Sequence, residues 1–183
     1  MLLSRRVGAS ACAITMIALT LACENPTEPD DPTDFVDATS SPELLTASGP
    51  TGKIYKVAGT DDKPDQFFEY DWKTSFTLTV KVNSDIKDTN YDLPVTVTSV
   101  NVKVQQASGG IVIAPSGDVE HSEFTMNSNG NLISAVDGTV SMLFDVWYDL
   151  PNVPKEALIT ITITFKDKDG LTFSEVKELR VLP

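Results

Sequence analysis

Alternation of apolar and polar residues over much of the chain is the feature that most restricts its fold. Between residues 139 and 148 the apolar side chains fall on the even positions, namely Val140, Met142, Phe144, Val146 and Tyr148. Side chains of a β-strand point to opposite faces with a period of two, so such a segment buries one face and exposes the other. The segment predicts a strand with one face in a core.

The same period recurs in earlier segments. Residues 68–82 carry most of their apolar side chains on even positions, and they predict one long strand or two strands that share a bend near residues 73–75. Residues 95–105 are apolar first on one phase and then on the other. A change of phase by one residue predicts a β-bulge near Thr98 and Ser99.

The C-terminal part of the chain predicts a hairpin. Residues 157–165 place isoleucine and phenylalanine on odd positions with threonine between them, and residues 171–182 form the return strand. The turn between them contains Asp and Gly, which favour tight turns. No stretch of the chain shows a convincing helical period.

These segments together predict the fold class. About seven or eight strands fit into residues 52–183, and each strand has one apolar face. Two sheets must therefore cover each other. We expect an all-β protein, specifically a two-sheet antiparallel β-sandwich.

Residues 158–181 carry a family resemblance. They contain the row Thr160, Thr162 and Thr164, the turn sequence DKDG at residues 167–170, and Ser174 in the return strand. This pattern resembles the closing hairpin of bacterial immunoglobulin-like and fibronectin-III-like surface domains. The resemblance implies an Ig-like sandwich, a fold that serves adhesion, carbohydrate binding, protein assembly and spacing alike. The cysteine and tryptophan landmarks of true immunoglobulin domains are missing, so the exact strand topology stays open.

The N-terminus predicts export. Arg5 and Arg6 precede a mostly apolar run at residues 7–21, which is too short to span a bilayer as a helix but suits the core of a secretory signal. We therefore expect residues 1–22 to be a signal peptide. The arginine pair also fits the start of a twin-arginine signal, but the next residues lack the apolar pair expected there, which favours ordinary Sec export.

The end of this signal resembles the lipobox of bacterial lipoproteins. Residues 19–23 read LTLAC, in which Ala22 and Cys23 match the pattern, whereas Thr20 and Leu21 depart from it. The resemblance implies that Cys23 carries a thioether-linked diacylglycerol and becomes the new N-terminus, so the protein's partner is a membrane. The alternative is cleavage by ordinary signal peptidase, because Thr20 and Ala22 satisfy its small-x-small rule. That route would release a soluble protein with a free thiol.

The segment that follows predicts a spacer. Residues 23–51 contain five prolines and several acidic residues but no Lys or Arg. Proline fixes the backbone and like charges repel, so the segment buries too little apolar surface to offset the entropy of ordering. We expect an acidic, Pro-rich disordered tether over residues 23–51 and a folded domain over residues 52–183.

The acidic residues of the chain indicate which partners it can bind and in which membrane it is located. The net charge is −12, and it becomes more negative once the signal is removed. Such a surface repels phosphate backbones, which argues against a nucleic-acid partner. Glu24 stands where an Asp would resemble an inner-membrane retention signal, so we expect the outer membrane of the cell envelope.

Two residues are candidates for recognition. Trp147 lies on the face of its strand opposite the apolar side chains, beside Asp145. Tryptophan is enriched among interface hot spots. Packing under the loop at residues 150–154 is the simpler alternative for Trp147. Tyr70 and Trp72 share the apolar face of their strand, and we expect both in the core.

Few other residues of the sequence suggest a metal site or a catalytic site. Asp167 and Asp169 are weak calcium candidates, but a hairpin turn explains them equally, because the further ligands of a calcium loop are missing. His121 is the single histidine. No nucleophile elbow and no Gly-rich phosphate loop is present, and we expect no enzyme activity, no metal and no cofactor.

The sequence therefore predicts a lipid-anchored binding or interaction module of the cell envelope for a glycan or a protein. One alternative is an assembly lipoprotein that binds an envelope protein by strand addition at a sheet edge. A hydrolase is the more distant alternative.

Overall fold

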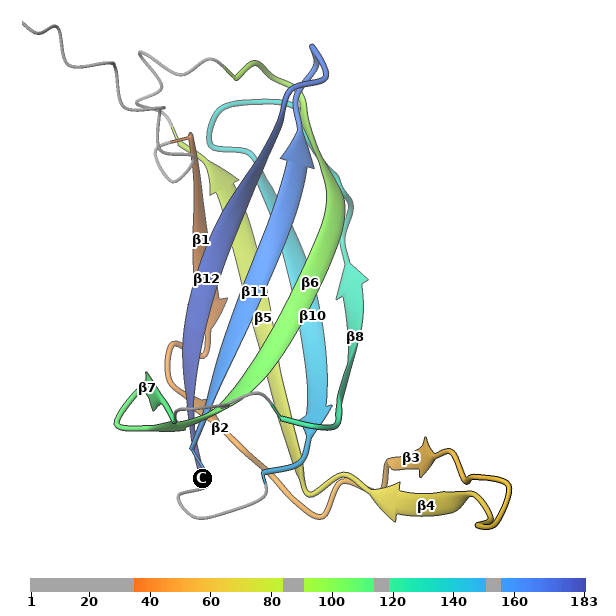
Figure 1. Ribbon diagram of the computed structural model, residues 1–183. Coiled ribbons are helices and arrows are strands. Elements are labelled where there is room, and N and C mark those ends of the chain that lie inside the picture. The colour runs from red at the N-terminus through yellow and green to blue at the C-terminus, as the bar shows by residue number, and fades with distance from the viewer. Residues whose placement is uncertain (1–34, 84–90, 114–118, 151–155) are drawn as a thin grey trace, which may run out of the picture.

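The chain forms an all-β sandwich of two packed sheets (Figure 1). The computed structural model describes residues 35–83, 91–113, 119–150 and 156–183. These residues contain twelve strands, more than the seven or eight expected, because three of them have only two residues and two more form a separate hairpin. The strands are β1 (Val36–Ser41), β2 (Leu45–Thr46), β3 (Ile54–Val57), β4 (Gln66–Glu69), β5 (Trp72–Val82), β6 (Val95–Ser108), β7 (Ile111–Val112), β8 (Ser122–Ser128), β9 (Leu132–Ile133), β10 (Thr139–Tyr148), β11 (Glu156–Lys166) and β12 (Thr172–Leu182).

The strand order of the two sheets is compatible with an immunoglobulin-like domain. One sheet has the order β1-β5-β10-β8. The other has the order β2-β12-β11-β6-β7, and β9 pairs with β6. These orders correspond to strands ABED on one sheet and to strands G, F and C, flanked by short strands, on the other. All pairings are antiparallel except that of β2 with β12, which is parallel.

The predicted alternation is confirmed in the core. The even positions of β5 and β10 and the odd positions of β11 point between the sheets, and their side chains are at most 2% exposed except for Trp72 at the start of β5, which is partly buried. Phe76 of β5 and Phe144 of β10 stack with ring centroids 5.1 Å apart. The apolar faces of the two sheets thus form a single continuous core.

The predicted bulge is also present. Ser99 pairs with Thr164 and Val97 pairs with Phe165, which leaves Thr98 as the extra residue of β6. The Thr98 hydroxyl donates to the Thr164 carbonyl over 3.1 Å. The change of phase in the sequence therefore marks a real irregularity of the sheet.

The strand over residues 68–82 bends earlier than expected. The break lies at Tyr70 and Asp71, between β4 and β5, and not near residues 73–75. Beyond it, β4 leaves the sandwich and pairs with β3. The resulting hairpin, residues 53–69, projects from one end of the sandwich (Figure 1) and is called the arm below.

The boundary predicted between tether and domain is wrong. Within the predicted tether, residues 35–51 belong to the sandwich, because β1 pairs with β5 and β2 pairs with β12. Phe35, Val36 and Leu45 are at most 1% exposed. Their burial outweighs the acidic and proline residues among residues 35–51, namely Asp37, Pro42, Glu43 and Pro50, all of which are exposed. The predicted signal peptide and Cys23 lie outside the described residues, and among the described residues no helix is long and apolar enough to cross a membrane.

Candidate functional site

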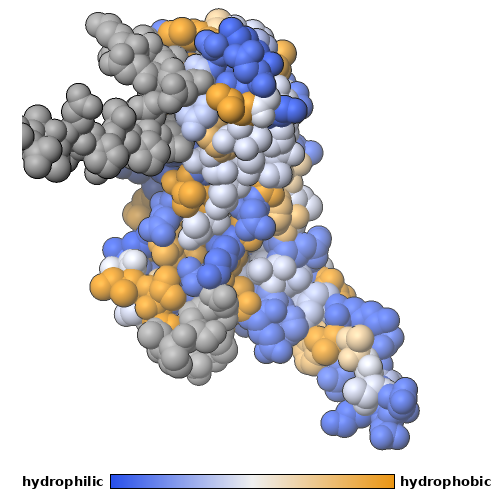
Figure 2. All heavy atoms as spheres, turned by 45° about the horizontal axis from the view of Figure 1, so that its top comes forward, coloured by the Kyte–Doolittle hydropathy of each residue, from blue (hydrophilic) through white to orange (hydrophobic). Residues whose placement is uncertain are grey.

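The arm exposes apolar side chains on both faces. Opposed residues of an antiparallel pair share a face. One face therefore carries Tyr55, Val57, Gln66 and Phe68, and the other carries Ile54, Lys56, Phe67 and Glu69. Ile54 and Phe67 are 62% and 67% exposed, and Figure 2 shows hydrophobic surface on the arm beside the hydrophilic surface of its tip.

Backbone hydrogen bonds fix the base of the arm. The Tyr70 amide donates to the Lys53 carbonyl over 2.9 Å, and the Thr51 hydroxyl donates to the Tyr70 carbonyl over 2.8 Å. The Gly52 amide donates to the Glu69 carboxylate over 2.6 Å. A two-stranded hairpin is only marginally stable alone, so these contacts and the packing at the base hold the arm in place.

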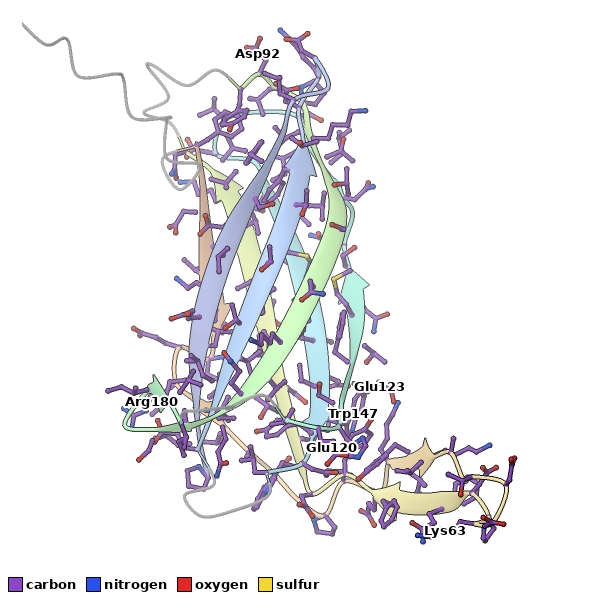
Figure 3. All side chains as sticks on the ribbon, in the orientation of Figure 1. Lys63, Asp92, Glu120, Glu123, Trp147 and Arg180 are labelled. Carbon is purple, nitrogen blue, oxygen red and sulfur yellow. The ribbon has the colours of Figure 1, made fainter. Side chains whose placement is uncertain are left out.

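Trp147 belongs to this base. It lies on the outer face of β10, as its phase predicts, but it is only 9% exposed. Lys53 Nζ lies 4.3 Å and Lys73 Nζ 5.1 Å from the centroid of its ring. Lys53 also forms an ion pair of 2.7 Å with Glu123, and Figure 3 shows Glu123 and Trp147 at the end of the sandwich from which the arm leaves.

Asp145 completes the cluster around Trp147. Its carboxylate accepts a hydrogen bond of 2.5 Å from the Ser75 hydroxyl and forms an ion pair of 3.0 Å with Lys73. The hydrogen bond from Ser75, followed by the contacts with Lys73, holds the pKa of Asp145 below its ordinary value. The structure thus brings Trp147 and Asp145 together through Lys73. Their groups already have partners, and the indole is covered by lysine side chains instead of lying open to a ligand.

An aromatic cluster lies on the inner side of the arm. The ring centroid of Tyr55 is 4.4 Å from that of His121, 4.6 Å from that of Tyr70 and 5.8 Å from that of Phe68. Tyr70 is buried as expected, but beneath the arm and outside the core between the two sheets. Trp72, by contrast, is partly buried and packs against that core. The cluster joins β3 and β4 to the segment that leads into β8.

This cluster opens into a cavity of about 520 Å³. The residues that line it are Tyr55, Val57, Gln66, Phe68, Glu120, His121 and Asp149. Three rings, two carboxylates and one amide therefore face the same space. Figure 3 shows Glu120 at the end of the sandwich where the arm begins.

Asp149 ties the cavity to the sandwich. Its carboxylate accepts a hydrogen bond of 2.8 Å from the Asp71 amide, at the break between β4 and β5. Its own amide donates to the His121 carbonyl over 3.2 Å. Burial, followed by a hydrogen bond and repulsion from the Asp149 carboxylate, raises the pKa of Tyr55 above its ordinary value. The Tyr55 hydroxyl therefore stays neutral and can donate.

His121 and Glu120 are neighbours on the wall of this cavity. His121 Nε2 lies 3.7 Å from Glu120 Oε1, beyond hydrogen-bond distance, and the Glu120 side chain is 89% exposed. In the part of the chain that the structure describes, no group of three or more His, Cys, Asp or Glu side chains is placed to hold a metal ion. Aromatic faces beside hydrogen-bonding groups can hold a ligand that has both apolar and polar edges.

The calcium candidates form a turn. Asp167 Oδ1 accepts hydrogen bonds from the amides of Asp169 and Leu171 over 2.9 and 2.8 Å, and Oδ2 lies 3.3 Å from the Asp92 amide. The Asp167 carboxylate thus satisfies the backbone of the β11–β12 hairpin. Asp92 in turn forms an ion pair of 3.0 Å with Lys168, at the end of the sandwich opposite the arm (Figure 3).

A second concave surface lies between the sheets, along β6 and β8. A groove of about 350 Å³ is lined mainly by apolar side chains, among them Val97, Val100, Phe124, Met126 and Met142. The edge of β6 that faces away from β11 pairs with β9 near one end and with β7 near the other, and the Val119 amide donates to the Val104 carbonyl over 3.2 Å. Among the described strands, none pairs with residues 98–102 on that edge.

The sequence did not single out the arm cavity. Tyr55 and Phe68 lie in strands of four residues, too short for a clear period, and His121 and Asp149 lie in other parts of the chain. The signal that could have found them is Phe67, a large apolar residue that comes directly before the alternating segment 68–82 and lies out of its phase. A comparison of the sequence with protein-family models found no match, and a comparison with curated proteins found none either.

Proposed function

We propose that this chain is a non-catalytic binding module of the bacterial cell envelope, anchored by lipid on Cys23, which binds a glycan in the cavity at the base of its arm. The observation that carries the proposal is the convergence of Tyr55, Phe68 and His121 with two carboxylates around a cavity of about 520 Å³. Under the same proposal the sandwich is an immunoglobulin-like or fibronectin-III-like surface domain.

The chemistry of the cavity fits a sugar. A pyranose ring presents an apolar face of C–H groups, which packs on aromatic rings, and a rim of hydroxyl groups. Carboxylate and amide oxygens, such as those of Glu120 and Gln66, accept hydrogen bonds from such hydroxyls. The arm is already fixed at its base by Trp147 and its lysines, so binding needs little ordering of the protein.

The direction of the strands supports an anchored protein that reaches outward. Val36, the first residue of β1, pairs with Val82, the last residue of β5, whereas the arm adjoins Trp72, the first residue of β5. The eleven residues of β5 therefore separate the start of β1 from the arm, roughly 33 Å for an extended strand. An anchor that precedes β1 leaves the cavity at the end of the domain far from the membrane (Figure 1).

A glycan-binding assay with two matched variants tests the proposal. The full-length chain is screened against envelope polysaccharides and oligosaccharides, together with Phe68→Ala and Phe67→Ala. These neighbours lie on opposite faces of the arm, and their side chains are 44% and 67% exposed, so neither substitution removes a core side chain. We expect Phe68→Ala to weaken binding at least tenfold and Phe67→Ala to leave it unchanged. Equal loss in both variants, or no glycan bound by the parent chain, would contradict the proposal.

The anchor is tested separately. In bacterial cells Cys23→Ala should move the protein from the membrane fraction to the soluble fraction, and mass spectrometry of the parent chain should find a diacylglycerol on Cys23. A parent chain that begins at Cys23 with a free thiol would show the ordinary signal peptidase route instead.

Strand addition at the groove between β6 and β8 is the second candidate function. It is favoured by residues 98–102 of β6, whose edge away from β11 pairs with no other described strand and lies beside an apolar floor that an extended peptide could cover. A photocrosslinker placed at Met126 and, in a second protein, at Phe68 compares the two surfaces in the native membrane. A crosslink to a protein at Met126, with none at Phe68, would favour this candidate over the cavity.

A further inference from the structure

Apart from His121, the ionisable side chains with an ordinary charge at neutral pH that line the arm cavity are acidic. Glu120 and Asp149 line it, and none of the described residues that line it is Lys or Arg. Lys53, at the base of the arm, is paired with Glu123 and lies over the ring of Trp147. The cavity therefore combines aromatic faces with uncompensated acidic groups.

Further negative charge acts on the same rings. The Asp71 carboxyl, next to Tyr70, repels the ionised form of Tyr55, as does Asp149, and Glu123 acts on Tyr70 in the same sense. These effects contribute to the raised pKa values of both tyrosines, after the larger effect of burial. The whole chain has a net charge of −12, which adds a field of the same sign.

This combination selects among ligands. The carboxylates of the cavity repel a ligand with carboxylate or sulfate groups. They neither attract nor repel a neutral ligand. A cation gains from the faces of the aromatic rings and from charge-assisted hydrogen bonds to the carboxylates. The acidic surface also raises the local concentration of cations and the rate at which they associate.

We infer that the glycan bound in this cavity is an amino sugar with a free, protonated amine, which sits against the Tyr55, Phe68 and His121 rings and pairs with Glu120 or Asp149. The inference rests on the proposed function, since it names the ligand class of the same site. It excludes acidic polysaccharides and fully N-acetylated glycans as preferred ligands.

Two oligosaccharide series that differ only at the nitrogen test the inference. Glucosamine oligosaccharides and N-acetylglucosamine oligosaccharides of equal length are titrated into the full-length chain at neutral pH and low salt. We expect the glucosamine series to bind at least tenfold more tightly, with a preference that shrinks as salt is added. Equal binding of both series, or preference for the acetylated one, would overturn the inference and leave a glycan-binding site standing.

Charge variants locate the effect. Glu120→Gln removes a mostly exposed carboxylate of the cavity, so it should fold normally, and we expect it to lower the preference for glucosamine severalfold. Glu178→Gln makes the same change of net charge on the exposed outer face of β12 and should leave the preference unchanged. Equal effects of both variants would overturn the inference, because only the general charge of the protein would then matter. Failure of the parent chain to bind any glycan would reject the proposed function together with the inference.

Discussion

The sandwich buries its large apolar side chains, whereas the arm exposes several of its own. In the sandwich, two sheets cover each other, and phenylalanines such as Phe144 have no exposed surface. In the arm, two strands have no covering layer, every residue of β4 is exposed, and Phe67 is 67% exposed. The contrast indicates that the exposed side chains of Ile54 and Phe67 contribute little to the stability of the fold.

The interactions that hold the sandwich and the arm in place also differ. The sandwich is held by burial over its whole length, whereas the arm is held at its base by ion pairs, hydrogen bonds and the contacts of Lys53 and Lys73 with Trp147. A local change at that base should therefore loosen the arm without unfolding the sandwich.

The largest expected effect is the difference in stability between a core variant, Phe144→Ala, and an arm variant, Phe67→Ala. Phe144→Ala should lower the free energy of unfolding by about 3–5 kcal/mol, because it leaves a cavity beside Phe76 in the core. Phe67→Ala should change it by less than about 0.5 kcal/mol, because the ring is mostly in solvent. Denaturant unfolding of both variants measures the difference, and a loss of similar size in Phe67→Ala would show that the arm contributes to the core.

The ion pair between Glu156 and the exposed Arg180 in the sandwich gives the next effect. Glu156 is 7% exposed, binds Arg180 through both carboxylate oxygens, and accepts hydrogen bonds from the amides of Gly109 and Gly110 over 3.0 and 2.7 Å. Figure 3 shows Arg180 beside β7, at the turn that these glycines form. We expect Glu156→Gln to cost about 1–3 kcal/mol at neutral pH, since it weakens hydrogen bonds to a charged group.

The cost of Glu156→Gln should depend on pH. The contact with Arg180, followed by the two amides, holds the pKa of Glu156 below its ordinary value of 4.5. The folded state therefore favours the charged form, and the stabilisation is complete above pH 4.5 and is lost as the pH falls through the lowered pKa. Unfolding curves of parent and variant should converge in acid. A difference that stays constant down to the lowest pH would contradict this account.

The smallest expected effect concerns the base of the arm. Lys53→Met keeps the apolar stem but removes the ion pair with Glu123 and the charge over Trp147, at a cost of about 1 kcal/mol. Amide hydrogen exchange in residues 53–69 should become roughly fivefold faster, while the exchange of the core strands is unchanged. Lys81→Met is the control, because it removes an exposed ion pair with Asp137 at the far end of β5. Faster exchange in β11 of Lys53→Met would show that arm and sandwich do not open separately.

Much of the sandwich was predictable because its burial follows the period of the strand. The even positions of β10 and the odd positions of β11 are buried as their pattern indicates, and the phase change in β6 marks the bulge at Thr98. The first strand was not predicted, because the prolines and acidic residues around Phe35 and Val36 carry the composition of a disordered segment. Only the pairing of β1 with β5, which is remote in sequence, orders them.

The candidate site was less predictable than the fold. The phase of Trp147 correctly placed it on the outer face, but its cover comes from Lys53 on the arm, which no local pattern reveals. The cavity needs Tyr55, His121 and Asp149 to meet from three separate parts of the chain. Such a meeting follows from the bend at Tyr70, which sends β4 out of the sheet and has no clear mark in the alternation of the sequence.

Mapping the bound ligand on the protein tests the central claim most directly. Backbone amide signals of the isotope-labelled full-length chain are followed by NMR while a glucosamine oligosaccharide is added. The account predicts shifts confined to the arm cavity, at Tyr55, Phe68, His121 and Asp149, with the groove between β6 and β8 unchanged. Shifts centred on Val100 and Met126, or no shifts at a concentration where glycans bind, would contradict a binding site at the base of the arm.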